Sequence, residues 1–214
     1  MLSNEWLKKI IHGTGPQAQR VDRNTNNLGF GWLYYGLARL LWARWVIVIG
    51  SGKGFAPCCY AKAMNDEDRG GTVILIDPSY KGLEPPSYGG IGFWDDAEAV
   101  EQHFSSMGTQ NIQLLKKTSA EALVEVEEIT GGKAQILHID GAHSFENAKE
   151  DFNLYSRFIE MGGVAVLHDS FCQQWPGVSE AVEVFNRKRW DVLTLRLWPG
   201  LTLVTRKVGS AQEG

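Results

Sequence analysis

Short apolar runs alternate with longer amphipathic stretches from about residue 45 onward. The runs of four or five apolar residues suit buried strands, and the amphipathic stretches repeat apolar residues at helical spacing. The expected strands are 46–49, 73–76, 112–115, 135–139, 164–167, 192–195 and 201–204. The expected helices are 30–42, 55–64, 95–107, 120–129, 145–159 and 178–189. This alternation predicts an α/β fold with a mostly parallel sheet covered on both faces.

The end of the chain departs from this alternation. The last two expected strands are joined by a short connection that contains Pro199-Gly200, which favours a hairpin turn. We therefore expect one antiparallel strand inserted at the end of the order. The chain reads as an N-terminal helical cap over 1–44, a main domain over 45–208 and a flexible tail over 209–214.

A glycine-rich loop follows the first expected strand. Gly50-Ser51-Gly52-Lys53-Gly54 allows a tight turn and close approach of a ligand to backbone. The loop is not a phosphate-binding P-loop, because Lys53 is followed by Gly54. It also fits a dinucleotide fingerprint poorly, because Phe55 stands at the third glycine position. A tight turn without a ligand remains the alternative.

Carboxylates stand at the ends of three expected strands. Asp77, Asp140 and Asp169 each follow a buried apolar run. Ligands of open parallel sheets bind beyond the carboxyl ends of the strands. Asp77 can accept two hydrogen bonds from a ribose diol, or it can serve as a turn residue before Pro78. With the glycine loop, this layout favours a cofactor that contains adenosine.

Two later sequence blocks carry a family resemblance. Residues 137–144 read LHIDGAHS, and residues 162–170 read GGVAVLHDS. With the glycine loop and Asp77, these blocks resemble class I S-adenosylmethionine-dependent methyltransferases. More narrowly, they resemble small-molecule O-methyltransferases such as those that act on macrolide sugars and aminocoumarins. The resemblance runs from about Gly29 to Val204 and implies a Rossmann-like, seven-stranded sheet whose last strand is antiparallel.

The resemblance also implies which residues hold S-adenosylmethionine. The loop residues would contact the methionine part, Asp77 the ribose, and residues after the third strand the adenine. The implied cofactor residues are Gly50, Ser51, Gly52, Asp77, Ser119, Ala120 and Asp140. One position departs from the family pattern: Val48 stands where an acidic residue is usual, two residues before the first glycine.

Asp140, His143 and Asp169 form the next group of candidate residues. The resemblance implies a divalent ion at the ends of the fourth and fifth strands, and Asp140 and Asp169 are its candidate ligands. Mg²⁺ prefers carboxylate and water oxygens, and a bound ion would lower the pKa of an acceptor hydroxyl. The metal-free alternative uses His143 or His168 as the general base, with Asp140 orienting the acceptor. Ser144 after His143 is also a candidate N-cap.

The charge, cysteine and tryptophan content of the chain indicate which binding partners and which cellular compartment to expect. The formal net charge of the 214 residues is -4, which argues against a nucleic-acid surface. Three cysteines without a C-x-x-C spacing, and no signal-peptide pattern over 1–11, indicate a cytoplasmic protein rather than a secreted or membrane protein. Four of eight tryptophans lie at positions 6, 32, 42 and 45. They predict core packing of the cap, with a homodimer contact as the alternative.

These observations predict an enzyme that transfers a methyl group to a small molecule, at a hydroxyl oxygen. An NAD-dependent oxidoreductase uses a similar strand, loop and carboxylate, but Phe55 argues against it. A third reading is a binding module that holds S-adenosylmethionine without catalysis, and Val48 keeps that reading open.

Overall fold

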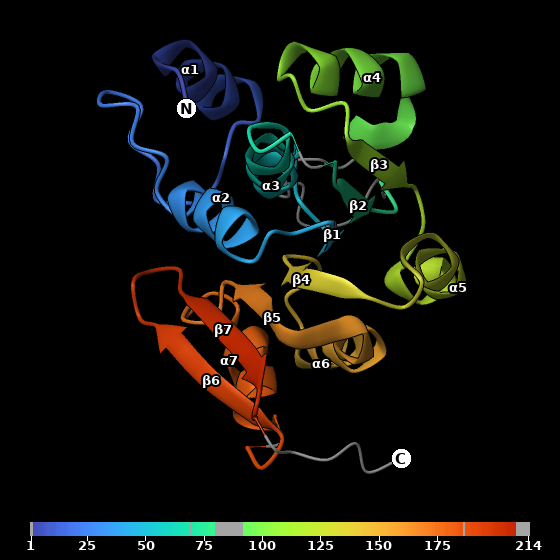
Figure 1. The fold of residues 1–214 in the computed structure, drawn as a ribbon. Coiled ribbons are helices and arrows are strands. Elements are labelled where there is room, and N and C mark those ends of the chain that lie inside the picture. Colours follow the sequence, from blue (N-terminus) through green and yellow to red (C-terminus); the bar gives the residue numbers. More distant parts are fainter. Residues whose placement is uncertain (1, 69, 80–91, 186, 209–214) are drawn as a thin grey trace.

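A computed structural model describes residues 2–68, 70–79, 92–185 and 187–208. Within these residues the strands form one seven-stranded sheet, in the order β3-β2-β1-β4-β5-β7-β6 (Figure 1). The strands are β1 Trp45–Ile49, β2 Thr72–Ile76, β3 Ile112–Leu115, β4 Ala134–Ile139, β5 Ile159–His168, β6 Trp190–Leu195 and β7 Leu201–Arg206.

The sheet is parallel except for β7. Pairs among the first five strands are parallel, whereas β7 is antiparallel to both β5 and β6. The expected antiparallel last strand is therefore confirmed. A hydrogen bond from Gly200 N–H to Leu197 O, 2.7 Å long, closes the connection between β6 and β7.

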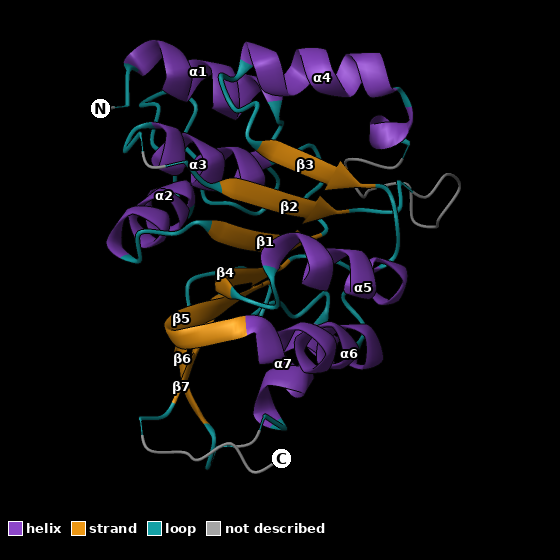
Figure 2. Cartoon of the chain, turned by 45° about the vertical axis from the view of Figure 1, so that its right-hand side comes forward, coloured by secondary structure: helices purple, strands orange, loops and turns teal. Residues whose placement is uncertain are grey.

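Helices cover both faces of the sheet (Figure 2). They are α1 Asn4–Gly13, α2 Gly31–Leu40, α3 Phe55–Asn65, α4 Ala97–Ser106, α5 Ser119–Thr130, α6 Phe145–Tyr155 and α7 Pro176–Glu183, with short 3₁₀ turns at Phe93–Asp95 and Ser156–Phe158. Successive residues of β1 point to opposite faces: Val46 and Val48 pack with α1 to α4, and Ile47 and Ile49 with α5 to α7. Strand β1 is apolar throughout because both of its faces are buried.

The N-terminal region is more ordered than its polar sequence suggested. Helix α1 was not expected, although Ser3 caps it by accepting a hydrogen bond from Trp6 N–H. Trp6 is buried in the same apolar cluster as α3, which agrees with core packing. Trp32 and Trp42 are 46% and 65% exposed. The boundary of the N-terminal cap at residue 44 and the homodimer contact stay predictions. The tail over 209–214 lies outside the described residues.

Two helices end earlier than their periodicity predicted. The helix expected over 145–159 stops at Tyr155, and Ile159 already belongs to β5. The Arg206 guanidinium on β7 donates a hydrogen bond to Ser156 O at 3.1 Å, which holds this turn against the sheet. The helix expected over 178–189 spans only Pro176–Glu183, because residues beyond it turn to begin β6. Arg187 donates to Val182 O, one of the open carbonyls at that helix end.

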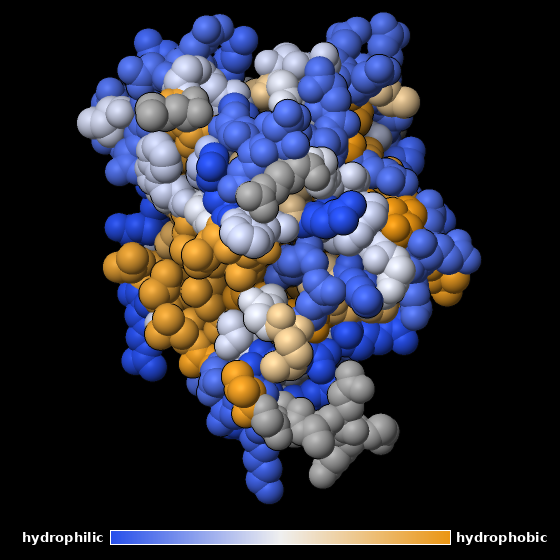
Figure 3. Space-filling view, in the orientation of Figure 1, coloured by the Kyte–Doolittle hydropathy of each residue, from blue (hydrophilic) through white to orange (hydrophobic). Residues whose placement is uncertain are grey.

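An apolar surface lies over α2, β6 and β7 on the face seen in Figure 3. Exposed leucines on these elements include Leu40 of α2 and Leu193 of β6. Among the described residues, no helix is both long and apolar enough to cross a membrane.

The first testable prediction concerns Gly50, where β1 and β4 meet. Gly50 has φ +69°, and a Cβ there would lie 2.5 Å from Asp140 O. We expect Gly50→Ala to lower the free energy of unfolding by about 2–5 kcal/mol through backbone strain and overpacking. Gly36→Ala in α2 is the matched control; its Cβ meets nothing within 4 Å, and it should stabilise the helix by roughly 0.5–1 kcal/mol. Urea unfolding measures both, and equal stabilities would contradict this account of the turn.

Candidate functional site

The parallel register brings the predicted strand ends to one edge of the sheet. Ile49 lies beside Ile76 on one side and Ile139 on the other, so Gly50, Asp77 and Asp140 follow at the same level. Gly50 N–H donates to Ile76 O and Asp140 N–H to Ile49 O, each at 2.9 Å. The glycine loop and the strand-end carboxylates therefore lie together.

The glycine loop leaves room and an unused hydroxyl at this edge. Gly50, Gly52 and Gly54 all have positive φ, which is favourable only for glycine. Gly54 is the residue before the first turn of α3. Ser51 is buried, and its Oγ has no hydrogen-bond partner among the described residues. Because buried polar groups are usually paired, this hydroxyl is suited to a ligand.

Asp77 combines a turn role with a partly buried position. Its Oδ1 accepts a hydrogen bond from Ser79 N–H at 2.9 Å, so the turn interpretation is correct for that oxygen. Burial raises the pKa of the Asp77 carboxyl. Such a carboxylate gains from hydrogen-bond donors that a ligand brings, and the turn does not exclude that role.

Ser119 and Ala120 form the first turn of α5 near the ends of β3 and β4. Thr118 and Glu121 make a reciprocal capping box there, and the Ser119 carbonyl accepts the Tyr155 hydroxyl at 2.6 Å. Sequence reasoning missed Asp151 of α6, which is 5% exposed beneath this turn. One Asp151 oxygen would lie 3.4 Å from a Cβ at Gly141. Burial raises the pKa of the Asp151 carboxyl to about 6, although a hydrogen bond from the Ser119 side chain acts in the opposite direction and lowers this pKa.

Two carboxylates and two histidines meet at the ends of β4 and β5. His143 Nε2 lies 2.8 Å from Asp169 Oδ2. His168 Nδ1 lies 3.2 Å from Asp140 Oδ1 and 3.0 Å from Asp169 Oδ2. Asp169 adopts φ +56°, a strained conformation of the kind that collects at functional sites. The structure thus joins all four side chains that the sequence nominated here.

The charges in this cluster depend on each other. Burial alone would lower the pKa of His168, but the Asp140 and Asp169 carboxylates raise it to about 10. Burial alone would raise the pKa of Asp169, but hydrogen bonds from His143 and His168 hold it well below its usual range. At neutral pH the cluster therefore contains a buried imidazolium between two carboxylates.

Three side chains of the cluster could offer ligand atoms to a divalent ion. Asp140, His143 and Asp169 each offer one ligand atom, and these atoms lie within 4.8 Å of one another. However, Asp169 Oδ2 already faces both imidazoles, and Asp140 Oδ1 faces His168. An ion shared by both carboxylates would have to displace these contacts against the charge of His168. The contacts of these two oxygens favour the metal-free arrangement, whereas Asp169 Oδ1 is buried without a partner among the described residues.

Aromatic and N-terminal residues enclose the cluster. The Trp175 ring stacks on His143 at a centroid distance of 4.6 Å, and the Phe30 edge contacts His168. Gln19, which sequence reasoning did not single out, bonds to Asp140 from the segment ahead of α2. No local pattern marks Gln19, because its partner lies 121 residues away.

Two further histidines and an aromatic residue have structural roles. His138 is fully buried and bonds through Nδ1 to the Tyr60 hydroxyl at 3.0 Å. His103 Nε2 lies 3.0 Å from Lys53 O. Trp94 is 2% exposed and stacks on Phe104, so it belongs to the packed core. Tyr80 and the loop over 81–91 lie outside the described residues.

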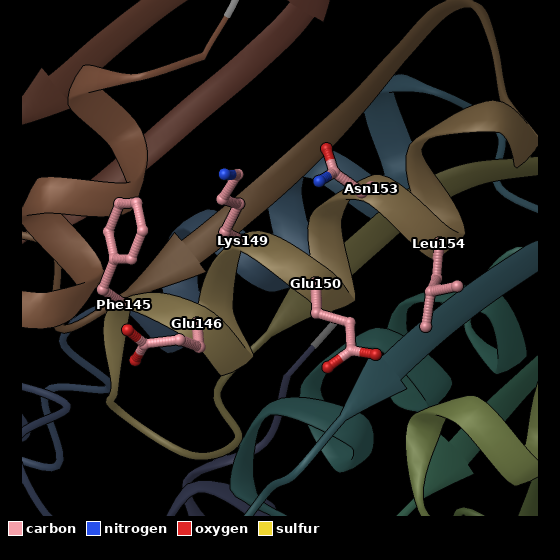
Figure 4. A pocket seen from close by; sticks show the side chains of 6 residues that line it. All are labelled: Phe145, Glu146, Lys149, Glu150, Asn153 and Leu154. Carbon is pink, nitrogen blue, oxygen red and sulfur yellow. The ribbon is translucent and has the colours of Figure 1, made fainter.

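Two surface hollows lie elsewhere, on the outer side of α6. The larger, about 310 Å³, is lined by Phe145, Glu146, Lys149, Glu150, Asn153 and Leu154 (Figure 4). The second, about 280 Å³, lies between α6, α7 and β6. None of the four residues of the acid–histidine cluster lines either hollow. Of these three places, the cluster is the one that combines carboxylates with imidazoles, so it is the candidate for the chemistry.

Comparison with known proteins relates the chain to methyltransferases. The sequence profile of the family described as "Methyltransferase domain" matches residues 47–170. An uncharacterized protein, y4gI, of Sinorhizobium fredii (strain NBRC 101917 / NGR234) is 26% identical over 144 residues. That match covers 65% of this chain but only 15% of the much longer relative.

Two solved structures share the fold. The O-methyltransferase TomG from Streptomyces achromogenes, involved in tomaymycin synthesis and solved with SAM, has a TM-score of 0.68 at 16% identity. The similarity covers 97% of this chain and 92% of TomG. An O-methyltransferase from Bacillus cereus solved with SAH has a TM-score of 0.68 at 13% identity, covering 97% and 93% of the two chains.

Asp151 generates a prediction about pH. The folded protein holds this proton more tightly than the unfolded chain, so stability falls as pH rises from about 4 to 6. The variant Asp151→Asn has no carboxyl to ionise at this position, so it does not lose this stability. The free energy of unfolding of the variant minus that of the unaltered protein should therefore be roughly 2–3 kcal/mol larger at pH 7 than at pH 4. Urea unfolding at both pH values measures this difference, with the exposed Asp191→Asn as control. A difference that is the same at both pH values would rule out the raised pKa.

Proposed function

The chain belongs to the methyltransferase-domain family, and we propose that it transfers a methyl group from S-adenosylmethionine to a hydroxyl oxygen of a small molecule. The observation that carries the proposal is the single sheet edge shared by the glycine loop and the acid–histidine cluster. Gly50 directly adjoins Asp140 there, and Asp140 shares His168 with Asp169. This arrangement supports a cofactor site beside a proton-accepting site.

Cofactor binding is assigned to the residues around the loop. Gly50, Ser51 and Gly52 would contact the methionine part, and the unused Ser51 hydroxyl supports this assignment. Asp77 would accept the ribose hydroxyls. Ser119 and Ala120 would lie beside the adenine, at the first turn of α5.

The chemistry requires a base beside the acceptor. S-adenosylmethionine supplies a methyl group, and in-line attack of the acceptor oxygen on the methyl carbon breaks the carbon–sulfur bond. We assign the hydroxyl proton to His143, because Asp169 orients its imidazole and stabilises the charge that develops. His168 is the weaker candidate, because an imidazolium whose pKa is about 10 has no site for a proton at neutral pH. Its charge instead offsets the two carboxylates.

The proposed reaction proceeds without a metal ion, and the contacts of Asp169 Oδ2 and Asp140 Oδ1 with histidines support this choice. We also propose that the protein is located in the cytoplasm and that it forms a homodimer through its tryptophan-rich N-terminus.

A binding module without catalysis is the second candidate function. The fully buried Val48, which gives β1 no carboxylate near the loop, is the observation that favours it.

The cofactor assignment predicts the effect of Asp77→Ala. Loss of a carboxylate that accepts ribose hydroxyls should weaken S-adenosylhomocysteine binding by about 100-fold, because hydrogen bonds to charged groups contribute about 1.5–3 kcal/mol each. Isothermal titration calorimetry measures the affinity, and circular dichroism checks the fold. Asp191→Ala, an exposed aspartate on β6, is the control. Unchanged affinity in Asp77→Ala would remove the ribose role.

The base assignment predicts the effect of His143→Gln in a chelating buffer. Transfer of a tritiated methyl group to a panel of hydroxylated small molecules should persist in EDTA for the unaltered protein. In His143→Gln, kcat should fall by roughly 100-fold or more, as for other general bases, with unchanged affinity for S-adenosylhomocysteine. His12→Gln, at the exposed end of α1, is the control. Turnover that EDTA abolishes and Mg²⁺ restores would instead establish the metal mechanism.

A further inference from the structure

The segment ahead of α2 places a buried amide in the site. Gln19 is 5% exposed and lies outside the stretch that the family profile matches. Its Nε2 lies 3.4 Å from Asp140 Oδ2, and its Oε1 accepts the Tyr34 hydroxyl at 2.9 Å. Gln19 therefore bridges the sheet edge and α2 through both ends of its side chain.

The chemistry of the partners sets the orientation of this amide. An ionised carboxylate can only accept hydrogen bonds, so Asp140 must face the NH₂ group. The Gln19 oxygen then faces Tyr34, whose fully buried hydroxyl donates to it. Each polar end of the amide has a complementary partner, and reversing the amide would oppose two acceptors at Asp140.

The backbone around Gln19 is strained. Ala18 and Arg20 have φ +55° and +56°, a region that costs L-residues free energy and persists only where the surroundings enforce it. Gln19 O accepts Phe30 N–H at 2.9 Å, and a Cβ at Gly29 would lie 2.1 Å from the same oxygen. Arg20 reaches across to Trp198 O at 3.1 Å. The close approach at Gly29 and these bonds hold the amide in place.

Asp140, whose carboxylate Gln19 contacts, adjoins the glycine loop through its backbone carbonyl. A Cβ at Gly50 would lie 2.5 Å from Asp140 O. Strand β1, which leads into the loop, is apolar throughout and offers no carboxylate. A ligand with an ammonium group at this loop needs an anionic partner, and Asp140 is placed to supply it.

We propose that Gln19 is a positioning residue that holds the Asp140 carboxylate toward the ammonium group of the cofactor's methionine part. This inference rests on the proposed use of S-adenosylmethionine. His168 contacts Asp140 Oδ1, so without Gln19 the carboxylate turns toward that imidazole and presents Oδ2 less well to the ligand.

The test compares two ligands that differ in the ammonium-bearing part. S-adenosylhomocysteine contains it, whereas 5′-methylthioadenosine keeps the adenosine and sulfur but lacks the amino acid. In calorimetry, Gln19→Leu should bind S-adenosylhomocysteine about tenfold more weakly, because one charge-assisted contact is weakened. Its affinity for 5′-methylthioadenosine should not change. Gln17→Leu, exposed on the same segment, is the matched control and should bind both ligands normally.

Two outcomes would overturn the role of Gln19: unchanged affinity for S-adenosylhomocysteine, or an equal loss for both ligands, which a merely structural role produces. If Gln19→Leu does not fold, Tyr34→Phe replaces it, because it keeps the amide but removes the hydroxyl that orients it. For Tyr34→Phe we expect a smaller loss of affinity that again affects S-adenosylhomocysteine and not 5′-methylthioadenosine. The absence of such a selective loss would overturn the proposal. If the unaltered protein binds neither ligand, the proposed function fails first.

Discussion

The buried imidazolium of His168 is the interaction on which the site depends. Two carboxylates at neighbouring strand ends repel each other, and burying them without a partner costs several kcal/mol. His168 lies within 3.2 Å of one and 3.0 Å of the other, so its single positive charge attracts both carboxylates and offsets one of the two negative charges. Because His168 ends β5 and Asp140 follows β4, the parallel register itself supplies this pairing. The remaining functional groups are arranged around these three side chains.

The two histidines of the cluster have different proposed roles. His168 is almost fully buried and bound to acids, so it holds the cluster together. His143 stands at the start of α6, where Ser144 caps the helix by accepting Asn147 N–H at 3.2 Å. It is slightly more exposed and stacks on Trp175. A group that exchanges a proton with an acceptor needs that access, whereas a structural cation does not.

Much of the fold followed from local sequence. Apolar runs of four or five residues located the strands, and the Pro199-Gly200 turn indicated the antiparallel β7. Strand-end logic also predicted that Asp140, His143 and Asp169 would meet, because the ends of neighbouring parallel strands share one edge. The start of β5 was misplaced, because Gly162 and Gly163 interrupt its apolar run. Gln19 and Asp151 were missed because tertiary packing alone brings them to the site, and no periodicity records such contacts.

We propose that one sheet edge binds S-adenosylmethionine beside the acid–histidine cluster. A crystal structure with S-adenosylhomocysteine and Mg²⁺ tests this proposal most directly. We expect the homocysteine part against the 50–52 loop and Asp140, the ribose hydroxyls on Asp77, the adenine at Ser119 and Ala120, and no ion between Asp140 and Asp169. Nucleoside bound elsewhere, or a Mg²⁺ ion that displaces His168 from both carboxylates, would contradict it.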